Sequence, residues 1–129
     1  MRENITHTKI IIACPEAPLR RVLVHSLHTL GCGGERVASH RALLARCVRH
    51  RYALVLTCFC APLIEDFRVT SRLRGASLHT SLFVLADNPS PSEVVALLER
   101  GVEQVLTLPV SILRLRAKIE GSLSQKFRL

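Results

Sequence analysis

Four short apolar segments and one weaker segment alternate with amphipathic stretches along this chain, and this alternation limits the possible folds more than any other feature. The apolar segments are residues 9–14, 53–59, 81–86 and 105–108, and the weaker one is 35–38. Segments that are apolar at successive positions are typical of strands covered on both faces, as in a parallel sheet. The alternation therefore predicts a three-layer α/β/α sandwich with a five-stranded parallel sheet in the middle.

Helix-start signals separate the predicted strands. N-cap serines precede three of the expected helices, at Ser39, Ser90 and Ser111. Glu93 lies three residues after Ser90, which is the spacing of a capping box, and proline occupies the first helical position between them. Two further helices are expected, one beginning at Pro18 and one after Pro62. The helix after Ser39 is expected to bury one face made of Leu43, Leu44, Cys47 and Val48.

The length of 129 residues, 48% of them hydrophobic, predicts one globular domain with its own core. We expect a tail at residues 1–8, the domain at 9–124, and a second tail or the start of a linker at 125–129. The longest apolar stretch, 53–64, has 12 residues, whereas a membrane-spanning helix needs about 20. Because residues 1–8 are polar and lack a signal-peptide core, we expect a cytoplasmic protein without a membrane partner.

The net charge of +8 is concentrated in the first half of the chain. Five arginines lie between positions 36 and 51, against a single acid, Glu35. A basic nucleic-acid-binding module is therefore one alternative function, using the helix after Ser39. Its candidate contacts are Arg41, Arg46, Arg49 and Arg51. The chain has one tyrosine and no tryptophan, which leaves little from which to build a stacking platform for single strands.

The five cysteines are odd in number and lie mostly in apolar runs, so we expect free thiols rather than a disulfide framework. Cys14, Cys58 and Cys60 follow or end predicted neighbouring strands, which keeps a thiol redox sensor open as a second alternative. A lone Cys-x-Cys lacks the paired spacing of zinc motifs, so no metal site is predicted. His79 precedes the strand at 81–86 and is expected at the opposite end of the sheet from Cys58, which argues against a Cys–His enzyme.

Over residues 8–124 the sequence resembles the receiver (CheY-like) domain of bacterial two-component response regulators. The segments that carry the resemblance are residues 9–12 with Glu16, the helix end at Leu30–Gly31, residues 53–56 with Pro62, residues 80–85, and residues 101–109. The resemblance implies a sheet order of 2-1-3-4-5, with the functional pocket at the carboxyl ends of the strands.

The residues that match the family's phosphorylation pocket have lost its chemistry. They are Cys14 and Pro15 at the acidic pair that holds Mg²⁺, Cys58 at the phosphoacceptor aspartate, Ala86 at the threonine or serine, and Leu108 at the lysine. Val105 matches the aromatic switch position, and Pro109 matches a proline that follows a cis bond. Since phosphoryl transfer depends on positioning and charge neutralisation, we expect no phosphorylation, no Mg²⁺ binding and no other cofactor.

The resemblance implies a pseudo-receiver that is not an enzyme and acts in signal transduction through protein contacts, linked to transcriptional regulation. Regulators of this family often form homodimers through the surface that matches the helix after Ser90, the strand 105–108 and the helix after Ser111. The matching charged residues are Glu93, Arg100, Glu103, Arg114 and Lys118. We expect opposite charges to pair there across a two-fold axis, and DNA to be contacted only through an attached output domain.

Overall fold

The computed structural model describes residues 10–31, 34–59 and 80–126 of the chain. Five parallel strands form one sheet in the order β2-β1-β3-β4-β5. The strands are β1 (Ile10–Ala13), β2 (Gly34–Val37), β3 (Leu54–Phe59), β4 (Ser81–Asp87) and β5 (Gln104–Leu108). The predicted parallel sheet and its strand order are confirmed.

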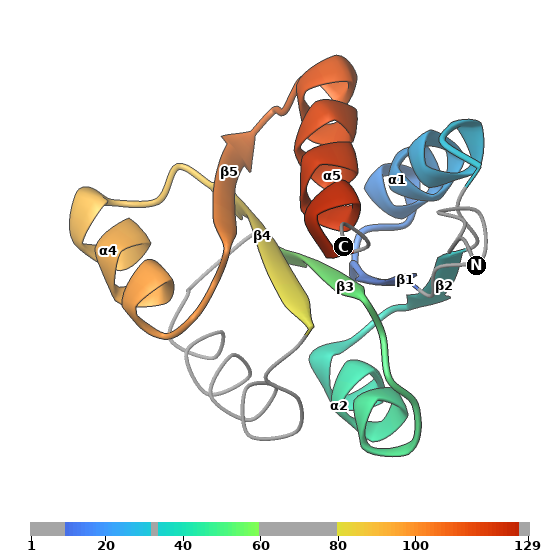
Figure 1. The fold of residues 1–129 in the computed structure, drawn as a ribbon. Coiled ribbons are helices and arrows are strands. Elements are labelled where there is room, and N and C mark those ends of the chain that lie inside the picture. The colour runs from blue at the N-terminus through green and yellow to red at the C-terminus, as the bar shows by residue number, and fades with distance from the viewer. Residues whose placement is uncertain (1–9, 32–33, 60–79, 127–129) are drawn as a thin grey trace.

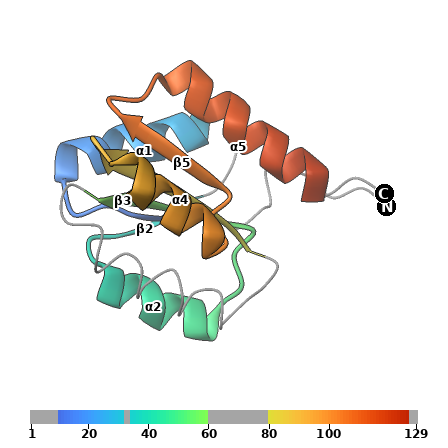
Figure 2. The ribbon, with the colours of Figure 1, turned by 90° about the vertical axis from the view of Figure 1, so that its left-hand side faces the viewer.

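Helices cover both faces of this sheet (Figures 1 and 2). They are α1 (Ala17–Thr29), α2 (His40–Arg49), α4 (Pro91–Glu99) and α5 (Ile112–Lys126). Buried leucines of α1 and α5 share one core cluster, and those of α2 and α4 share the other. Figure 2 shows α1 and α5 above the sheet and α2 below it. The helix expected after Pro62 lies outside the described residues.

Alternate residues of each central strand enter opposite cores, which explains why these strands are apolar at successive positions. Ile10 and Ile12 pack in the α1–α5 core, while Ile11 and Ala13 pack in the α2–α4 core. All four side chains of β1 are completely buried. A strand buried on both faces has no position at which a polar side chain is hydrated.

The expected helix caps form. The side chain of Ser39 accepts a hydrogen bond from the backbone N–H of Ala42 at 3.1 Å. At the start of α4, the N–H of Glu93 donates to Ser90 Oγ at 3.2 Å, and the N–H of Ser90 donates to Glu93 Oε1 at 2.8 Å. Ser111 Oγ accepts from the N–H of Arg114 at 3.3 Å. These bonds satisfy N–H groups that have no partner within the helix.

One expectation about the helices is wrong. Val48 is 81% exposed instead of belonging to the buried face of α2. It lies five residues after the buried Leu43, about 140° around the helix, and α2 packs mainly against β1 and β2 at one side of the sheet. The last helix, α5, continues to Lys126. In the part of the chain that the structure describes, no helix is long and apolar enough to cross a membrane.

Candidate functional site

The carboxyl ends of the strands bring together the residues that match the phosphorylation pocket. Ala13, the last residue of β1, pairs with Thr57 of β3, so Cys14 comes next to Cys58 in the register of the sheet. On the other side, β3 pairs with β4 and ends with Phe59 opposite Ala86. Leu108 ends β5 and pairs with Asp87. This is the edge at which open α/β sheets bind their ligands.

Four of the five pocket positions are wholly or partly packed as protein core, whereas Pro15 is exposed. Cys14, Cys58 and Ala86 have no solvent-exposed surface. The two cysteines lie in the core cluster under α1 and α5, whereas Ala86 lies in the opposite cluster. Leu108 is partly buried and packs against the same cluster as the cysteines. Apolar groups therefore occupy the places where a phosphoryl group and its ligands would need to meet water and charge.

The thiol and the backbone oxygen of Cys14 both have hydrogen-bond partners in the segment that follows it. Its thiol donates to the backbone oxygen of Glu16, with the two atoms 3.4 Å apart. Its backbone oxygen accepts from Arg20 Nη1 at 2.5 Å. Sequence reasoning did not single out Arg20, because no local sequence pattern reports a contact between its side chain and the end of β1. The arginine ties the start of α1 to the end of β1.

The residues at this edge do not fit a magnesium ion. Mg²⁺ requires near-octahedral coordination by oxygen atoms, usually from one or two carboxylates and several waters. Here the matching positions offer a buried thiol and a proline without a donor atom on its side chain. Glu16, at the start of α1, and Asp87, at the end of β4, are exposed carboxylates. Among the described residues, no three His, Cys, Asp or Glu side chains are grouped so as to hold a metal.

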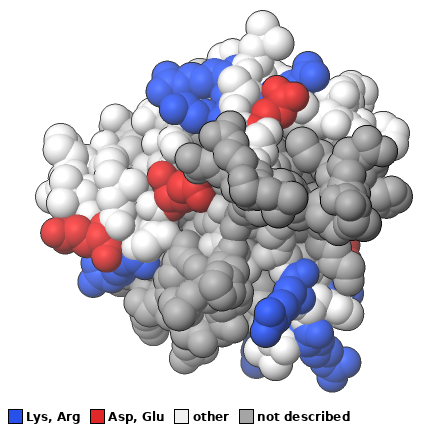
Figure 3. Space-filling view, viewed as in Figure 1, with Lys and Arg blue, Asp and Glu red and all other residues white. Residues whose placement is uncertain are grey.

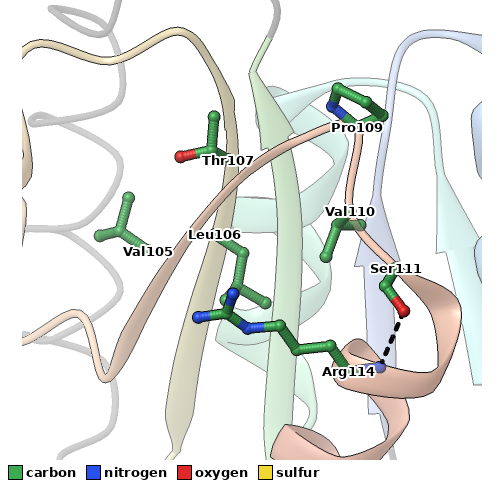
Figure 4. A pocket seen from close by; sticks show the side chains of 7 residues that line it. All are labelled: Val105, Leu106, Thr107, Pro109, Val110, Ser111 and Arg114. Carbon is green, nitrogen blue, oxygen red and sulfur yellow. Dashed lines mark hydrogen bonds between the residues drawn. The ribbon is translucent and has the colours of Figure 1, made fainter.

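A cavity of about 330 Å³ lies beside this edge, between β5 and the start of α5 (Figure 4). It is lined by Val105, Leu106 and Thr107 of β5, by residues 109–111, and by Arg114. Figure 4 shows the side chain of Arg114 extending across the cavity beside Leu106. The Leu108–Pro109 peptide bond is cis, which is the isomer that the resemblance implies. Val105, at the switch position, is partly buried against the α2–α4 core.

Solved receiver domains have the same architecture, although no protein-family model and no curated protein matches the sequence. A CheY-like receiver domain from Methanospirillum hungatei matches with a TM-score of 0.85, at 18% identity, over 92% of this chain and 95% of that one. An orphan response regulator of H. pylori matches with a TM-score of 0.84, at 21% identity, over 93% of this chain and 99% of that one. The chain has the receiver fold. The receiver domain of a signal transduction histidine kinase from Syntrophus aciditrophicus also matches, at 22% identity and a TM-score of 0.82, over 95% of each chain.

The α4–β5–α5 surface of this receiver fold carries the residues expected at a dimer interface. Glu103 and Arg114 are exposed, and Lys118 is half-buried. The carboxylate of Glu93 is used in the capping box of α4, and Arg100 Nη1 donates to the backbone oxygen of Ala96 at 3.2 Å. The charges of Glu93 and Arg100 are therefore partly satisfied within one chain. Exposed apolar side chains accompany the charged ones, namely Val95 and Leu98 on α4 and Leu113 on α5.

The basic residues between positions 36 and 51 do not form a single surface. Val37 and Glu35 lie on the α2 side of β2, so the alternation of the strand places Arg36 on the opposite side. Arg46 forms an ion pair with Glu35. The Tyr52 hydroxyl also donates to Glu35, at 2.6 Å, and this hydrogen bond is the main reason why the pKa of Glu35 is lowered.

The thiols of this receiver fold are poorly placed for redox sensing. Cys14 and Cys58 are fully buried, and reactive thiols need access to solvent and a stabilised thiolate. Cys47 is half-buried on α2, and burial raises its pKa to about 11. Cys60 and His79 lie outside the described residues. Within the described parts, the thiols therefore resemble core side chains.

Proposed function

We propose that this domain is a pseudo-receiver, a signalling module that works through protein contacts without aspartyl phosphorylation or catalysis. The observation that carries the proposal is the complete burial of Cys14, Cys58 and Ala86 at the pocket positions of a receiver fold. Receiver domains of response regulators and of a histidine kinase share this fold, which supports a place in two-component signal transduction.

The chemistry of the pocket positions supports the loss of phosphorylation. Phosphoryl transfer needs an acceptor, a metal that neutralises charge, and a cation that stabilises the transferred group. A thiol, a proline, an alanine and a leucine supply none of the oxygen ligands or the positive charge. Because protein interiors are close-packed, a pocket filled by such side chains has one favoured arrangement rather than two.

The contact surface that we propose is the α4–β5–α5 side, occupied by a second copy of the chain. The apolar walls of the cavity beside β5 and the exposed Leu98 and Leu113 supply surface that association would bury. Glu103 and Arg114 supply opposite charges, which a two-fold axis can bring together. In this proposal the dimer controls an output domain that acts in transcription.

Exposure to phosphoryl donors tests the first part of the proposal. The full chain is incubated with acetyl phosphate and Mg²⁺, and separately with beryllofluoride and Mg²⁺, beside a receiver that retains its aspartate. We expect the mass of the protein to stay unchanged. We also expect no Mg²⁺-dependent changes in the backbone NMR chemical shifts near Cys58. A phosphorylated product, or a beryllofluoride response centred on β3, would overturn the proposal.

Sedimentation across a range of concentrations tests the second part. Glu103→Lys is expected to weaken self-association, since it replaces an attractive charge pair by a repulsive one. Arg21→Glu on α1 is the matched control, because it reverses one exposed charge on another surface. A wild-type chain that remains monomeric at high concentration contradicts the homodimer.

A further inference from the structure

The outward face of α2 is basic and has no acidic partner on its own helix. The sequence of α2, HRALLARCVR, contains no aspartate or glutamate. Arg41, Ala45, Val48 and Arg49 are all exposed and lie on the side opposite to the buried Leu43. Arg51, which follows the helix, is exposed as well. Figure 3 shows the resulting group of basic side chains over α2.

Glu35, the one acid that the structure describes in an ion pair with this region, does not neutralise these arginines. Glu35 is engaged by Arg46 and by the hydroxyl of Tyr52. Of the arginines of α2, Arg46 is therefore the one whose charge is balanced by the carboxylate of Glu35 in the described structure. Arg41, Arg49 and Arg51 form no ion pair among the described residues, and we name them the α2 arginine triad.

Arg41 and Val48 on this face do not contribute to the stability of the fold. Arg41 lies in the first turn of α2, where the positive end of the helix dipole disfavours a cation, and no acid is present in that turn. Val48 exposes 81% of its surface, which gives the fold almost no hydrophobic stabilisation. Departures from local consistency that bring the fold no stability are expected at functional surfaces.

We propose that the α2 arginine triad binds the phosphate backbone of double-stranded nucleic acid. Guanidinium groups form paired hydrogen bonds with phosphate oxygens, and all three cations here are arginines. Arg41 and Arg49 are eight residues apart, or about 12 Å along the helix, which is close to the width of about 12 Å of the major groove in B-DNA. The short side chains of Ala45 and Val48 between them allow a close approach.

The same face is less suited to other polyanions. Single strands are usually held by exposed Phe, Tyr or Trp side chains, and Tyr52, the residue of this kind nearest to α2 in sequence, is buried. Membrane surfaces are usually bound by helices with a broad apolar face, whereas Val48 is the only large apolar side chain of α2 that is exposed. The proposal is independent of the pseudo-receiver proposal, since none of the three arginines is a pocket residue.

Salt dependence of binding tests this inference quantitatively. The probe is a fluorescent duplex of about 20 base pairs and mixed sequence, titrated with the full chain at several salt concentrations. Three phosphate contacts predict a log–log slope of about −2.7, which weakens binding about 40-fold between about 50 and about 200 mM salt. Arg41→Ala combined with Arg49→Ala is expected to reduce the slope to about −0.9.

The control is Arg21→Ala combined with Arg36→Ala, which removes the same net charge from exposed positions on α1 and on the α1 side of β2. This control should keep the wild-type slope. The single variant Arg41→Ala should raise the melting temperature of the protein slightly, because it removes a cation from the first turn of α2, and it should also weaken duplex binding. If Arg41 served only to stabilise the fold, its removal would lower the melting temperature instead. The inference is overturned if the triad variant and the control bind alike. It is also overturned if single-stranded DNA, phosphatidylserine vesicles or polyglutamate bind as tightly as the duplex.

Discussion

Replacing Cys58 by aspartate returns the family's acceptor residue to its position in the chain, but we expect the variant to lose stability without gaining phosphorylation. Cys58 has no exposed surface and lies in the α1–α5 core with Leu56 and Leu85. Leu108 stands where the resemblance implies a lysine, and Cys14 and Pro15 stand where it implies magnesium ligands. A carboxylate at position 58 would therefore be buried without the partners that stabilise it in a working receiver.

The expected loss follows from this burial. An uncompensated buried charge destabilises a protein by about 3–5 kcal/mol, and a buried polar group without a partner by about 1–3 kcal/mol. The first value applies at neutral pH and the second at acidic pH, where the carboxyl is protonated. Burial raises the pKa of the introduced carboxyl in the folded state above its unfolded value of about 3.9. Between these two pKa values the folded state binds more protons, so stability falls as the pH rises.

Urea denaturation of Cys58→Asp at about pH 4 and about pH 7 measures the loss of stability under each condition. Cys58→Ala and Cys58→Ser are the controls, because neither introduces a charge and their losses should not depend on pH. We expect Cys58→Asp to lose about 2 kcal/mol more at neutral pH than at acidic pH, relative to the controls. A variant as stable at neutral pH as Cys58→Ala, or one that acetyl phosphate phosphorylates, would refute the reasoning that this edge is packed as core.

The contacts outside the pocket predict three smaller effects. Ser90→Ala removes the capping box of α4 and should lower the free energy of unfolding by about 1 kcal/mol, while Glu93→Gln should lower it less; equal losses would contradict this account. Tyr52→Phe removes the main cause of the lowered Glu35 pKa. The loss of stability that wild type shows as the pH falls below the ordinary pKa range of a glutamate should therefore be smaller in the variant, as measured by urea denaturation, and an unchanged pH profile would count against this account. Cys47 has its pKa raised to about 11 by burial, so little of its thiol is ionised at pH 8, and it should react with iodoacetamide roughly 100-fold more slowly than an ordinary thiol. Peptide mass spectrometry measures the rate of labelling, and labelling at the ordinary rate would show that burial does not suppress the thiolate.

The layers of the fold were predictable because a strand that is buried on both faces is apolar at successive positions. Residues 10–13 must be apolar at every position, since successive side chains enter different cores. The start of α4 was equally predictable, because Ser90 and Glu93 satisfy each other's backbone within one turn. Strand order is a long-range property, and it came from the resemblance rather than from these local patterns.

The surroundings of individual charges were harder to predict. The sequence shows Glu35 among many arginines but does not show which of them folds back onto it, because the two partners come from a strand and a helix. The exposure of Val48 depends on how far α2 extends over the sheet edge, which helical spacing does not report. Arg20 follows the same rule: its bond to Cys14 depends on the angle at which α1 leaves β1.

The two proposed surfaces lie at opposite edges of the sheet, which makes them mechanically compatible. β2, beside α2, is one edge strand, and β5, beside α4, is the other (Figure 1). A dimer formed through α4, β5 and α5 therefore leaves the α2 arginine triad of each copy uncovered, and a two-fold axis supplies two triads to one duplex. Because the second contact is then intramolecular, Glu103→Lys should weaken duplex binding although it removes no arginine. The triad variant, Arg41→Ala combined with Arg49→Ala, should in contrast leave self-association in sedimentation unchanged. If the two surfaces act in one assembly, Glu103→Lys therefore affects both dimerisation and duplex binding, whereas the triad variant affects duplex binding alone. If the surfaces are unrelated, Glu103→Lys leaves duplex binding unchanged.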